Sequence, residues 1–268
     1  MATDSSFMQG YAALLSAAEL VPFDCPSPFG PADRYQLDEL AAITTKSWVY
    51  RATDQSFLAD GKAPRVAVKI SRSPGAELEG FLGRRVEHPG VVRVLEQGRT
   101  EEGHGYVVME WVDGGDLSST DLPWSARDAA RLVLRLARIV QAAHRVLVVH
   151  CDLKPSNVLL THDLEPRLAD FDLAQRVSDD SQSRKGTLAY MAPEQFRGGP
   201  GSQSVQADVY ALGGILHVLL KSLPPHGDDE ETIKAALRSG TWAECAGVEP
   251  SLCAIMRKAL RPTLNSGT

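Results

Sequence analysis

Apolar residues in the first half of the chain fall in short alternating runs. Residues 35–41, 48–52 and 66–70 carry alternating or β-branched residues with turn formers between them, and this pattern predicts strands. A further apolar run at 106–112 predicts another strand. This part of the chain is therefore predicted to form a small β-sheet.

The second half of the chain has helical spacing. Ser125 is followed by Asp128, as in a helix N-cap with an acid in the first turn. Apolar residues then recur at helical spacing, namely Ala129, Leu132, Val133, Leu136, Ile139, Val140 and Ala143. The acidic run 228–231 precedes another amphipathic stretch, where acids complement the helix dipole, and docking of basic substrates is its alternative role.

One polar segment interrupts the apolar pattern. Residues 150–157, with the sequence His-Cys-Asp-Leu-Lys-Pro-Ser-Asn, lie between the apolar runs 146–149 and 158–160, and Asp-Phe-Asp follows at 170–172. An Asp, a Lys, an Asn and a second Asp suit phosphoryl transfer, because that reaction needs a carboxylate to orient a hydroxyl, a cation near the phosphoryl group, and oxygen ligands for magnesium. A polar loop with chance Asp and Asn is the alternative.

These segments resemble the catalytic loop and metal-binding segment of protein kinases, which usually have His-Arg-Asp…Asn and Asp-Phe-Gly. Three other segments resemble the same family. Residues 66–69 are similar to its third strand, 186–194 to the end of its activation segment with Ala-Pro-Glu, and 208–214 to its buried F helix, whose Asp braces the catalytic loop.

The resemblance implies an α+β, bilobal protein-kinase-like fold. Its parts would be an N-terminal extension at 1–33, an antiparallel β N-lobe at 34–109, a hinge at 110–116 and a larger helical C-lobe at 117–268 that lacks its last helices. For the extension we expect a short helix and a tether or surface-docked arm, and a tail without function is the alternative.

The implied reaction is transfer of the γ-phosphoryl group of ATP to a serine or threonine hydroxyl of a protein substrate. The implied catalytic residues are Asp152, Lys154, Lys69 and Glu79, and the implied Mg²⁺ ligands are Asn157 and Asp170. Asp152 would accept or orient the hydroxyl proton, and Lys154 would steady the γ-phosphate. Lys69, paired with Glu79 or else Glu77, would hold the α- and β-phosphates.

The resemblance also implies the nucleotide contacts. The implied residues are Val49, Ala67, Lys69, Glu110, Val112, Asp116, Leu159, Thr44 and Ser47, with Met109 as the gatekeeper. Asp116 would contact the ribose hydroxyls. Val49, Ala67 and Leu159 would sandwich the purine, and ordinary core packing is the alternative for these three.

The loop expected to cradle the phosphates has no glycine. Ala42, Thr44 and Ser47 stand where the family has glycines, although glycine allows backbone amides to approach phosphate closely. We expect the loop either to be stiffer and further from phosphate, or to hold phosphate through the hydroxyls of Thr44, Thr45 and Ser47. Nucleotide affinity should be affected in either case.

Three other departures affect the expected site. Gly80 and Gly83 weaken the expected helix C, which is predicted to be short and mobile. Asp172 replaces the last glycine of Asp-Phe-Gly, which is either tolerated in a turn or alters metal affinity. Cys151 stands where many members have an arginine that pairs with an activation-loop phosphate, so we expect activity without such phosphorylation.

Composition narrows the function classes. The chain has 268 residues and a formal net charge of -6, which argues against nucleic acid as a partner. Its four cysteines are widely spaced, so neither a disulfide framework nor a zinc site is predicted, and a cytoplasmic location fits best. No apolar run reaches the length needed to span a membrane.

Two alternative functions stay open at this stage. A pseudokinase that binds nucleotide as a scaffold or sensor is favoured by the glycine-free loop, the short helix C and Asp172. A small-molecule phosphotransferase is disfavoured by the Ala-Pro-Glu segment at 192–194. Lys154 and Thr187 favour serine/threonine over tyrosine as the acceptor.

Overall fold

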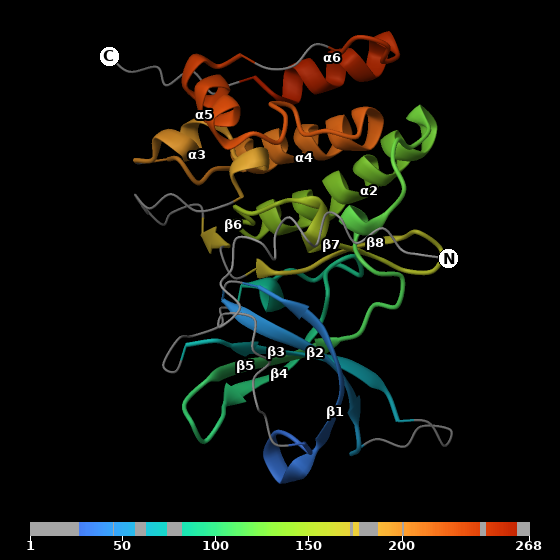
Figure 1. Cartoon of the computed structure of the whole chain (residues 1–268), viewed down its shortest axis with the longest axis vertical. Helices are drawn as coiled ribbons and strands as arrows, with labels where there is room; N and C mark the ends of the chain where they lie inside the picture. The colour runs from blue at the N-terminus through green and yellow to red at the C-terminus, as the bar shows by residue number, and fades with distance from the viewer. Residues whose placement is uncertain are drawn as a thin grey trace. The chain divides into compact units, whose positions relative to one another are not determined.

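A computed structural model of the chain describes residues 27–44, 46–56, 63–73, 82–171, 174–176, 187–199, 201–241 and 245–261. The chain divides into two compact units, drawn with the sequence colours in Figure 1. The first comprises the chain up to Leu78 together with Val94–Trp111, and the second comprises Glu79–Arg93 and Val112 to the end. The predicted hinge at 110–116 contains the last of these boundaries, between Trp111 and Val112.

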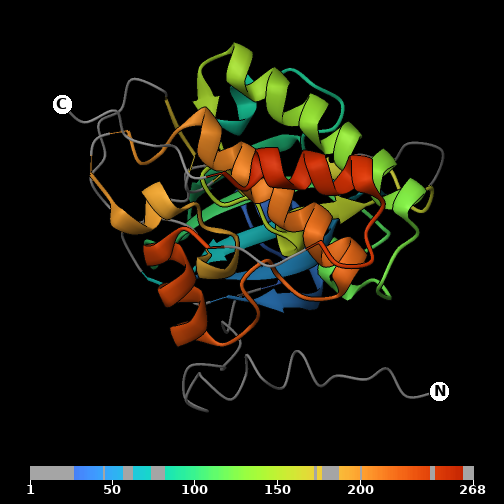
Figure 2. The same cartoon turned by 90° about the horizontal axis from the view of Figure 1, so that it is seen from above.

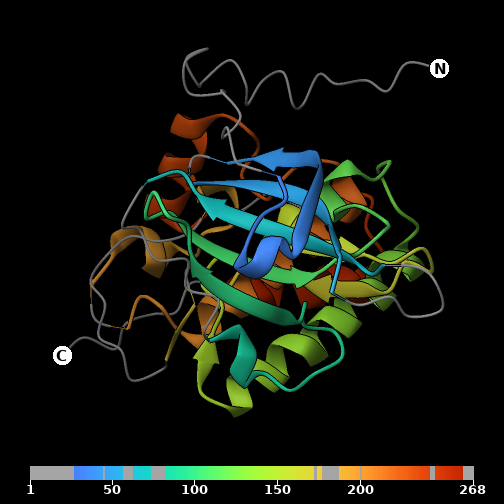
Figure 3. The same ribbon diagram turned by 90° about the horizontal axis from the view of Figure 1, so that it is seen from below.

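The first unit is a five-stranded antiparallel sheet in the order β1-β2-β3-β5-β4 (Figure 3). Its strands are β1 (Tyr35–Ile43), β2 (Ser47–Asp54), β3 (Arg65–Ser71), β4 (Val94–Arg99) and β5 (Gly105–Glu110). The predicted strands are all present. The pattern did not predict β4, an edge strand in which half-buried residues alternate with exposed ones and only one face packs.

The end of the predicted N-terminal extension packs on this sheet. Phe29 is buried, exchanges backbone hydrogen bonds of 2.7 and 2.9 Å with Tyr35, and its ring lies edge-on to Tyr106 with 4.9 Å between centroids. The 3₁₀ turn η2 (Pro31–Asp33) then leads into β1. The described part of the extension, from Ser27 onward, therefore contributes to the hydrophobic core of the sheet, and residues 1–26 lie outside the described ranges.

A polar network holds the chain entering β1 against the sheet. The Arg34 guanidinium donates to both carboxylate oxygens of Asp54 at 2.6 and 2.9 Å and to Glu96 at 3.2 Å. Glu96 also accepts from the Tyr35 and Tyr106 hydroxyls at 2.8 and 3.0 Å. Burial and the bond to Glu96 raise the pKa of Tyr106 to about 12, whereas the bidentate Arg34 contact lowers the pKa of Asp54 to about 2.

The second unit is mainly helical. Its helices are α2 (Ala126–Arg145), α3 (Pro193–Arg197), α4 (Val205–Lys221), α5 (Glu230–Ser239) and α6 (Pro250–Ala259). Two small antiparallel pairs join β6 (Val148–Val149) to β9 (Gln175–Arg176) and β7 (Val158–Leu160) to β8 (Pro166–Leu168). Short 3₁₀ turns are η3 (Gly83–Arg85), η4 (Leu117–Ser119), η5 (Pro155–Asn157) and η7 (Leu188–Tyr190).

Side-chain caps begin two of these helices, and the one at Ser125 was predicted from the sequence. The Ser125 hydroxyl accepts from the Asp128 amide at 3.1 Å at the start of α2. At the start of α5, the Asp229 carboxylate accepts from the Thr232 amide at 2.8 Å. The acidic run 228–231 thus supplies an N-cap, in line with the helix-start interpretation.

Helix α4 is the centre of the second unit and is buried along most of its length. Figure 2 shows α6 crossing α4, and Figure 1 shows α2 on the opposite side of α4. The close approach of α6 depends on Gly213, because a Cβ there would lie 2.9 Å from the Cβ of Ala259. Although α4 is apolar, no helix among the described residues has both the length and the apolar run needed to cross a bilayer.

Residues 82–93 pack with the second unit, although the predicted boundary placed them in the N-lobe. The Val92 amide donates to the Leu168 carbonyl at 2.9 Å, and the Leu168 amide donates to the Gly90 carbonyl at 2.7 Å. Val91 forms a parallel bridge with Leu168. These backbone bonds attach the segment before β4 to the end of β8.

The prediction about the cysteines is wrong for one pair. Cys245, in the segment after α5, is disulfide-bonded to Cys253 in α6, with 5.6 Å between their Cα atoms. The spacing showed no recognisable motif because the fold, and not the local sequence, brings the two sulfurs together. Cys151 is buried and is not part of this disulfide.

The ion pair at Asp54 generates a stability prediction. Asp54→Asn should reduce the free energy of unfolding at pH 7 by about 1–2 kcal/mol, since the folded-state pKa is lowered from 3.8 to about 2. Because that pKa is depressed, the contribution is present above about pH 4 and is lost as pH falls toward 2. The wild-type and variant unfolding energies, measured by urea denaturation, should therefore converge in acid. Asp38→Asn is the matched control, since exposed Asp38 accepts from Thr53 on the same strand pair. A gap that stays constant down to pH 2 would contradict the assignment.

Candidate active site

The polar loop after β6 is held by a buried carboxylate. Asp208, in the first turn of α4, is 1% exposed and accepts from the backbone amides of His150 and Cys151 at 2.9 and 3.0 Å. His144, in the last turn of α2, places its Nε2 2.8 Å from the same carboxylate. The prediction that this Asp braces the loop backbone is confirmed, and Cys151 takes a left-handed conformation with φ 67°.

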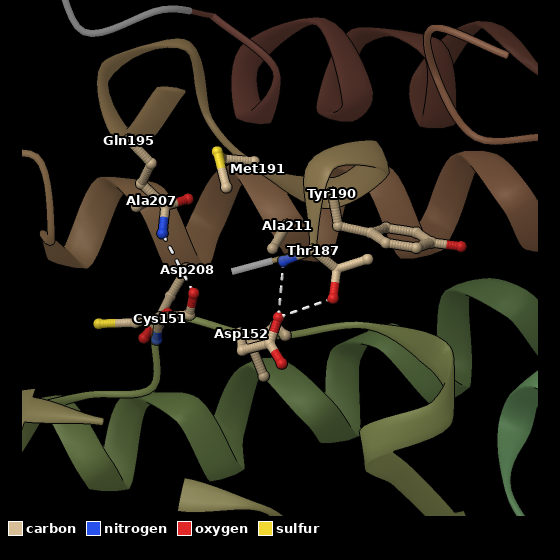
Figure 4. A pocket seen from close by; sticks show the side chains of 10 residues that line it. Cys151, Asp152, Thr187, Tyr190, Met191, Gln195, Ala207, Asp208 and Ala211 are labelled. Carbon is tan, nitrogen blue, oxygen red and sulfur yellow. Dashed lines mark hydrogen bonds between the residues drawn. The ribbon is translucent and has the colours of Figure 1, made fainter. Parts of the chain in front are cut away.

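Asp152, the proposed base, is held on both carboxylate oxygens. Its Oδ1 accepts from the Thr187 amide at 2.8 Å and the Thr187 hydroxyl at 2.9 Å, as the dashed lines in Figure 4 show. Its Oδ2 accepts from Lys154 Nζ at 2.7 Å, and Lys154 also donates to the Thr187 hydroxyl at 2.9 Å. Thr187 therefore contacts both Asp152 and Lys154.

Asn157 and Asp170 have the chemistry of a magnesium site. The Asn157 Nδ2 donates to the Asp152 carbonyl at 2.8 Å, and this bond fixes the side-chain amide with its Oδ1 as the remaining acceptor. The Asn157 carbonyl accepts from the Ala169 amide at 2.9 Å, which places Asn157 beside the residue that precedes Asp170. A carboxamide and a carboxylate oxygen fit Mg²⁺, which takes few protein ligands and completes its shell with phosphate and water.

Phe171 packs between the catalytic loop and the start of η3. Its ring centroid lies 4.6 Å from that of His150. A Cβ at Gly83 would lie 3.2 Å from the Phe171 ring. Close packing against Phe171 therefore explains why a glycine stands at this position, although glycine weakens a helix. Residues 74–81, with Glu77, Glu79 and Gly80, and also Asp172 and residues 177–186, lie outside the described ranges.

Two predicted nucleotide contacts of the second unit lie side by side. Asp116 forms an antiparallel bridge with Leu159, and Leu160 donates to the Gly115 carbonyl at 2.8 Å. The Asp116 Oδ1 accepts from the Ser118 amide at 2.8 Å and the Ser119 amide at 3.2 Å at the start of η4. The ribose role of Asp116 and the hinge role of Val112 stay predictions.

In the first unit, three predicted residues share one face of the sheet. Val49 is paired with Lys69 across β2 and β3, and Ala67, two residues before Lys69, is paired with Met109 on β5. Residues that are paired, or two apart on a strand, point to the same side, so Val49, Ala67 and Lys69 form one surface. Glu110 is the last residue of β5 and is paired with Val66.

The turn that replaces the glycine loop uses its polar groups internally. The Thr44 hydroxyl oxygen accepts from the amides of Lys46 at 3.2 Å and Ser47 at 2.9 Å and lies 2.9 Å from the Ser47 hydroxyl. The Thr44 amide donates to the Ser47 carbonyl at 2.8 Å, and Arg72 binds the carbonyls of Lys46 and Thr44 at 2.8 and 3.2 Å. Of the two expectations, the described geometry favours the stiff turn, and Thr45 lies outside the described ranges.

Comparison with known proteins agrees with this geometry. Residues 63–261 match the model of the protein kinase domain. The chain belongs to the protein kinase family. The expected fold class is confirmed, because the first unit is the five-stranded N-lobe sheet of a kinase and the second is the helical C-lobe.

The relatives of this kinase domain include bacterial serine/threonine-protein kinases. It is 29% identical to PknB of Mycolicibacterium smegmatis over 256 residues, covering 85% of this chain and 40% of the relative. It is 31% identical to a probable serine/threonine-protein kinase of Corynebacterium efficiens over 215 residues, covering 72% of this chain and 32% of the relative. The chain therefore spans about a third to two fifths of the length of the curated relatives that it matches.

Two residues of this site were missing from the sequence-based set. His144 binds Asp208, and Gln195 donates to the Cys151 carbonyl at 3.1 Å. The signals were weak, since His144 is one of several polar residues at a helix end and Gln195 follows the Ala-Pro-Glu segment without a role of its own in the motif.

The stiff turn generates a prediction about nucleotide affinity. Thr44→Gly should lower the Kd for Mg-ATP by about threefold or more, because it frees the amides of Lys46 and Ser47 from the threonine hydroxyl. Isothermal titration calorimetry measures this directly. Thr44→Ser is the matched control, since it keeps the hydroxyl acceptor and should leave the Kd within twofold. A higher Kd for Mg-ATP in Thr44→Gly would show instead that the Thr44 hydroxyl is a phosphate ligand.

Proposed function

We propose that this kinase domain transfers the γ-phosphoryl group of ATP to serine or threonine hydroxyls of a protein substrate. The observation that carries the proposal is the arrangement of Asp152, Lys154 and Thr187. One carboxylate is held by a lysine ammonium on Oδ2 and by two donors on Oδ1, all within 2.9 Å. A carboxylate fixed in this way is preorganised to orient a hydroxyl for reaction.

The transfer itself needs little covalent chemistry from the protein. The acceptor oxygen forms a bond to the γ-phosphorus, the bond to the β,γ-bridging oxygen breaks, and ADP leaves. Asp152 takes or orients the hydroxyl proton, and Lys154 carries positive charge next to it. Mg²⁺, held by Asn157 and Asp170, would supply charge neutralisation at the phosphates. Lys69, 8% exposed on the sheet face shared with Val49 and Ala67, would contact the α- and β-phosphates.

The choice of serine or threonine rests on two supports. Lys154 and Thr187 are the residue types that favour these acceptors over tyrosine, and they are bonded to each other and to Asp152. The matched relatives are named as serine/threonine-protein kinases. The substrate class is therefore a protein with an accessible serine or threonine.

A nucleotide-binding pseudokinase is the second candidate function. It is favoured by the turn at 44–47, in which the amides of Thr44, Lys46 and Ser47 already have partners within the turn. The catalytic loop argues for the enzyme, because a scaffold has no need of a base held by Lys154 and Thr187. Measured phosphoryl transfer separates the two candidates.

The role of Asp152 is tested by Asp152→Asn. This isosteric change should reduce phosphoryl transfer at least about 100-fold while the Kd for Mg-ATP changes by less than about threefold, because the side chain acts on the acceptor hydroxyl. Radiolabel transfer to a generic protein substrate measures the first quantity and calorimetry the second. Lys69→Met is the comparison variant, and it should weaken nucleotide binding as well. Equal transfer by wild type and Asp152→Asn would end the enzyme hypothesis.

Independence from activation-loop phosphorylation is tested with Ser178, Ser181 and Ser183. Their joint replacement by alanine should change kcat by less than about threefold, because Cys151 offers a phosphate no positive charge and is held through its backbone by Asp208. The measurement is the steady-state rate before and after phosphatase treatment. A tenfold or larger gain on autophosphorylation at these serines would contradict this expectation and point to a basic receptor such as Arg176 or Arg184.

A further inference from the structure

A buried glutamine connects the end of the activation segment to the catalytic loop. Gln195, in α3, is 3% exposed, and its Oε1 accepts from the Ala192 amide at 2.9 Å. Its Nε2 donates to the Cys151 carbonyl at 3.1 Å and to Gln203 Oε1 at 3.1 Å. The backbone partners fix the orientation of the side-chain amide, since an N–H must meet an oxygen and a carbonyl must meet a donor.

The bond from Gln195 acts on the peptide that precedes the base. The Cys151 carbonyl and the Asp152 nitrogen belong to one planar peptide group, so a bond to the carbonyl fixes the plane from which Asp152 extends. The Asp152 amide, at the opposite edge of that peptide group, donates to His150 Nδ1 at 3.4 Å. The other polar group of Cys151, its amide, donates to Asp208. Both polar backbone groups of Cys151 are therefore bonded.

One short stretch of chain contacts both ends of the base. Thr187 binds the Asp152 carboxylate, and Gln195, eight positions further along the sequence, binds the peptide before it. Figure 4 shows these residues gathered around Cys151, Asp152 and Asp208. The described residues line this region so closely that no volume is left for a water molecule. If the catalytic loop or the stretch 187–195 moved, a buried carbonyl or amide would lose its hydrogen-bond partner.

We infer that Gln195 is a positioning residue, which sets the Asp152 carboxylate against the acceptor hydroxyl through the Cys151 carbonyl. The inference rests on the proposed function. Cys151 supplies no charge for a phosphate. Gln195 holds this loop position through a neutral hydrogen bond to the Cys151 carbonyl, and Asp208 holds it through the Cys151 amide. The bond is built into the fold and does not depend on modification.

Two variants and one matched control test the inference. Gln195→Met removes the polar atoms at similar volume, and it should reduce kcat about tenfold while KM for ATP stays within twofold, since Gln195 contacts no predicted nucleotide residue. Gln203→Met is the control. It removes a buried glutamine of the same amide pair but leaves the bond to Cys151, and its kcat should stay within twofold of wild type.

Gln195→Glu adds a readout that a purely structural residue would not change. A buried protonated carboxylic acid can donate to the Cys151 carbonyl, whereas the ionised form cannot, and burial raises the pKa of such an acid toward neutrality. The ratio of variant to wild-type kcat should therefore rise as pH falls from 8 to 6. The ionisable groups nearby are Asp152, Asp208, Glu194, His150, Cys151 and Tyr190, and all of them are present in both proteins.

Hydrogen exchange of the peptide 148–157 separates this inference from the proposed function. Exchange should be faster in Gln195→Met than in Gln203→Met, whether or not phosphoryl transfer is detected. If wild type transfers no phosphoryl group, the proposed function fails and the exchange data still decide whether Gln195 holds the loop. Should Gln195→Met not fold, Gln195→Glu carries the same comparisons. The inference is overturned if exchange is equal in the Gln195 and Gln203 variants, or if their kcat values agree within twofold, or if the Gln195→Glu ratio does not change with pH.

Discussion

The buried carboxylate of Asp208 is the interaction on which the rest of the site depends. An ionised carboxylate that is 1% exposed is costly unless donors surround it, and here two loop amides and His144 supply them. Because a carboxylate accepts only, His144 must donate through its Nε2. If the loop moved away from α4, the Asp208 carboxylate would lose two of its hydrogen-bond donors. The position of Asp152 therefore depends on a helix that is buried along most of its length.

The surrounding helices make that tie rigid. Helix α2 supplies His144, and α6 approaches α4 closely enough at Gly213 that a side chain would not fit. The disulfide between Cys245 and Cys253 attaches the preceding segment to α6. Asp208 is therefore held by packing on several sides of α4, while the loop it braces carries the chemistry.

Three residues in or near the catalytic loop carry backbone strain. Leu147, Cys151 and Asp170 all have left-handed backbones, with φ of 61°, 67° and 63°. Such a conformation costs roughly 1 kcal/mol or more for a residue with a Cβ, so it persists only where other contacts fix it. For Cys151 these contacts are the bonds to Asp208 and Gln195. The loop conformation is thus maintained by its partners and not by local preference.

The sequence predicted the parts of this kinase domain that are encoded by local pattern. The strands, the N-cap at Ser125 and the order of the motifs around Asp152 and Asp208 follow from period and spacing. Contacts between residues far apart in the sequence could not be predicted in the same way. The cysteine pair and the bond from Gln195 depend on which turns meet in space, and no local signal records that. Edge strand β4 was not predicted because its half-buried positions, Val94, Glu96 and Gly98, form no alternating apolar pattern.

The two units of the domain are constrained in different ways. In the C-lobe, Lys154 and Thr187 are both bonded to the carboxylate of Asp152. In the N-lobe, the polar groups of the turn at 44–47 bind one another and Arg72. Groups that already have partners must give them up before they can hold a ligand, and this adds an energetic cost to binding. The carboxylate of Asp152 is therefore held in place by its partners, whereas the turn at 44–47 would have to break bonds of its own before it could hold a phosphate.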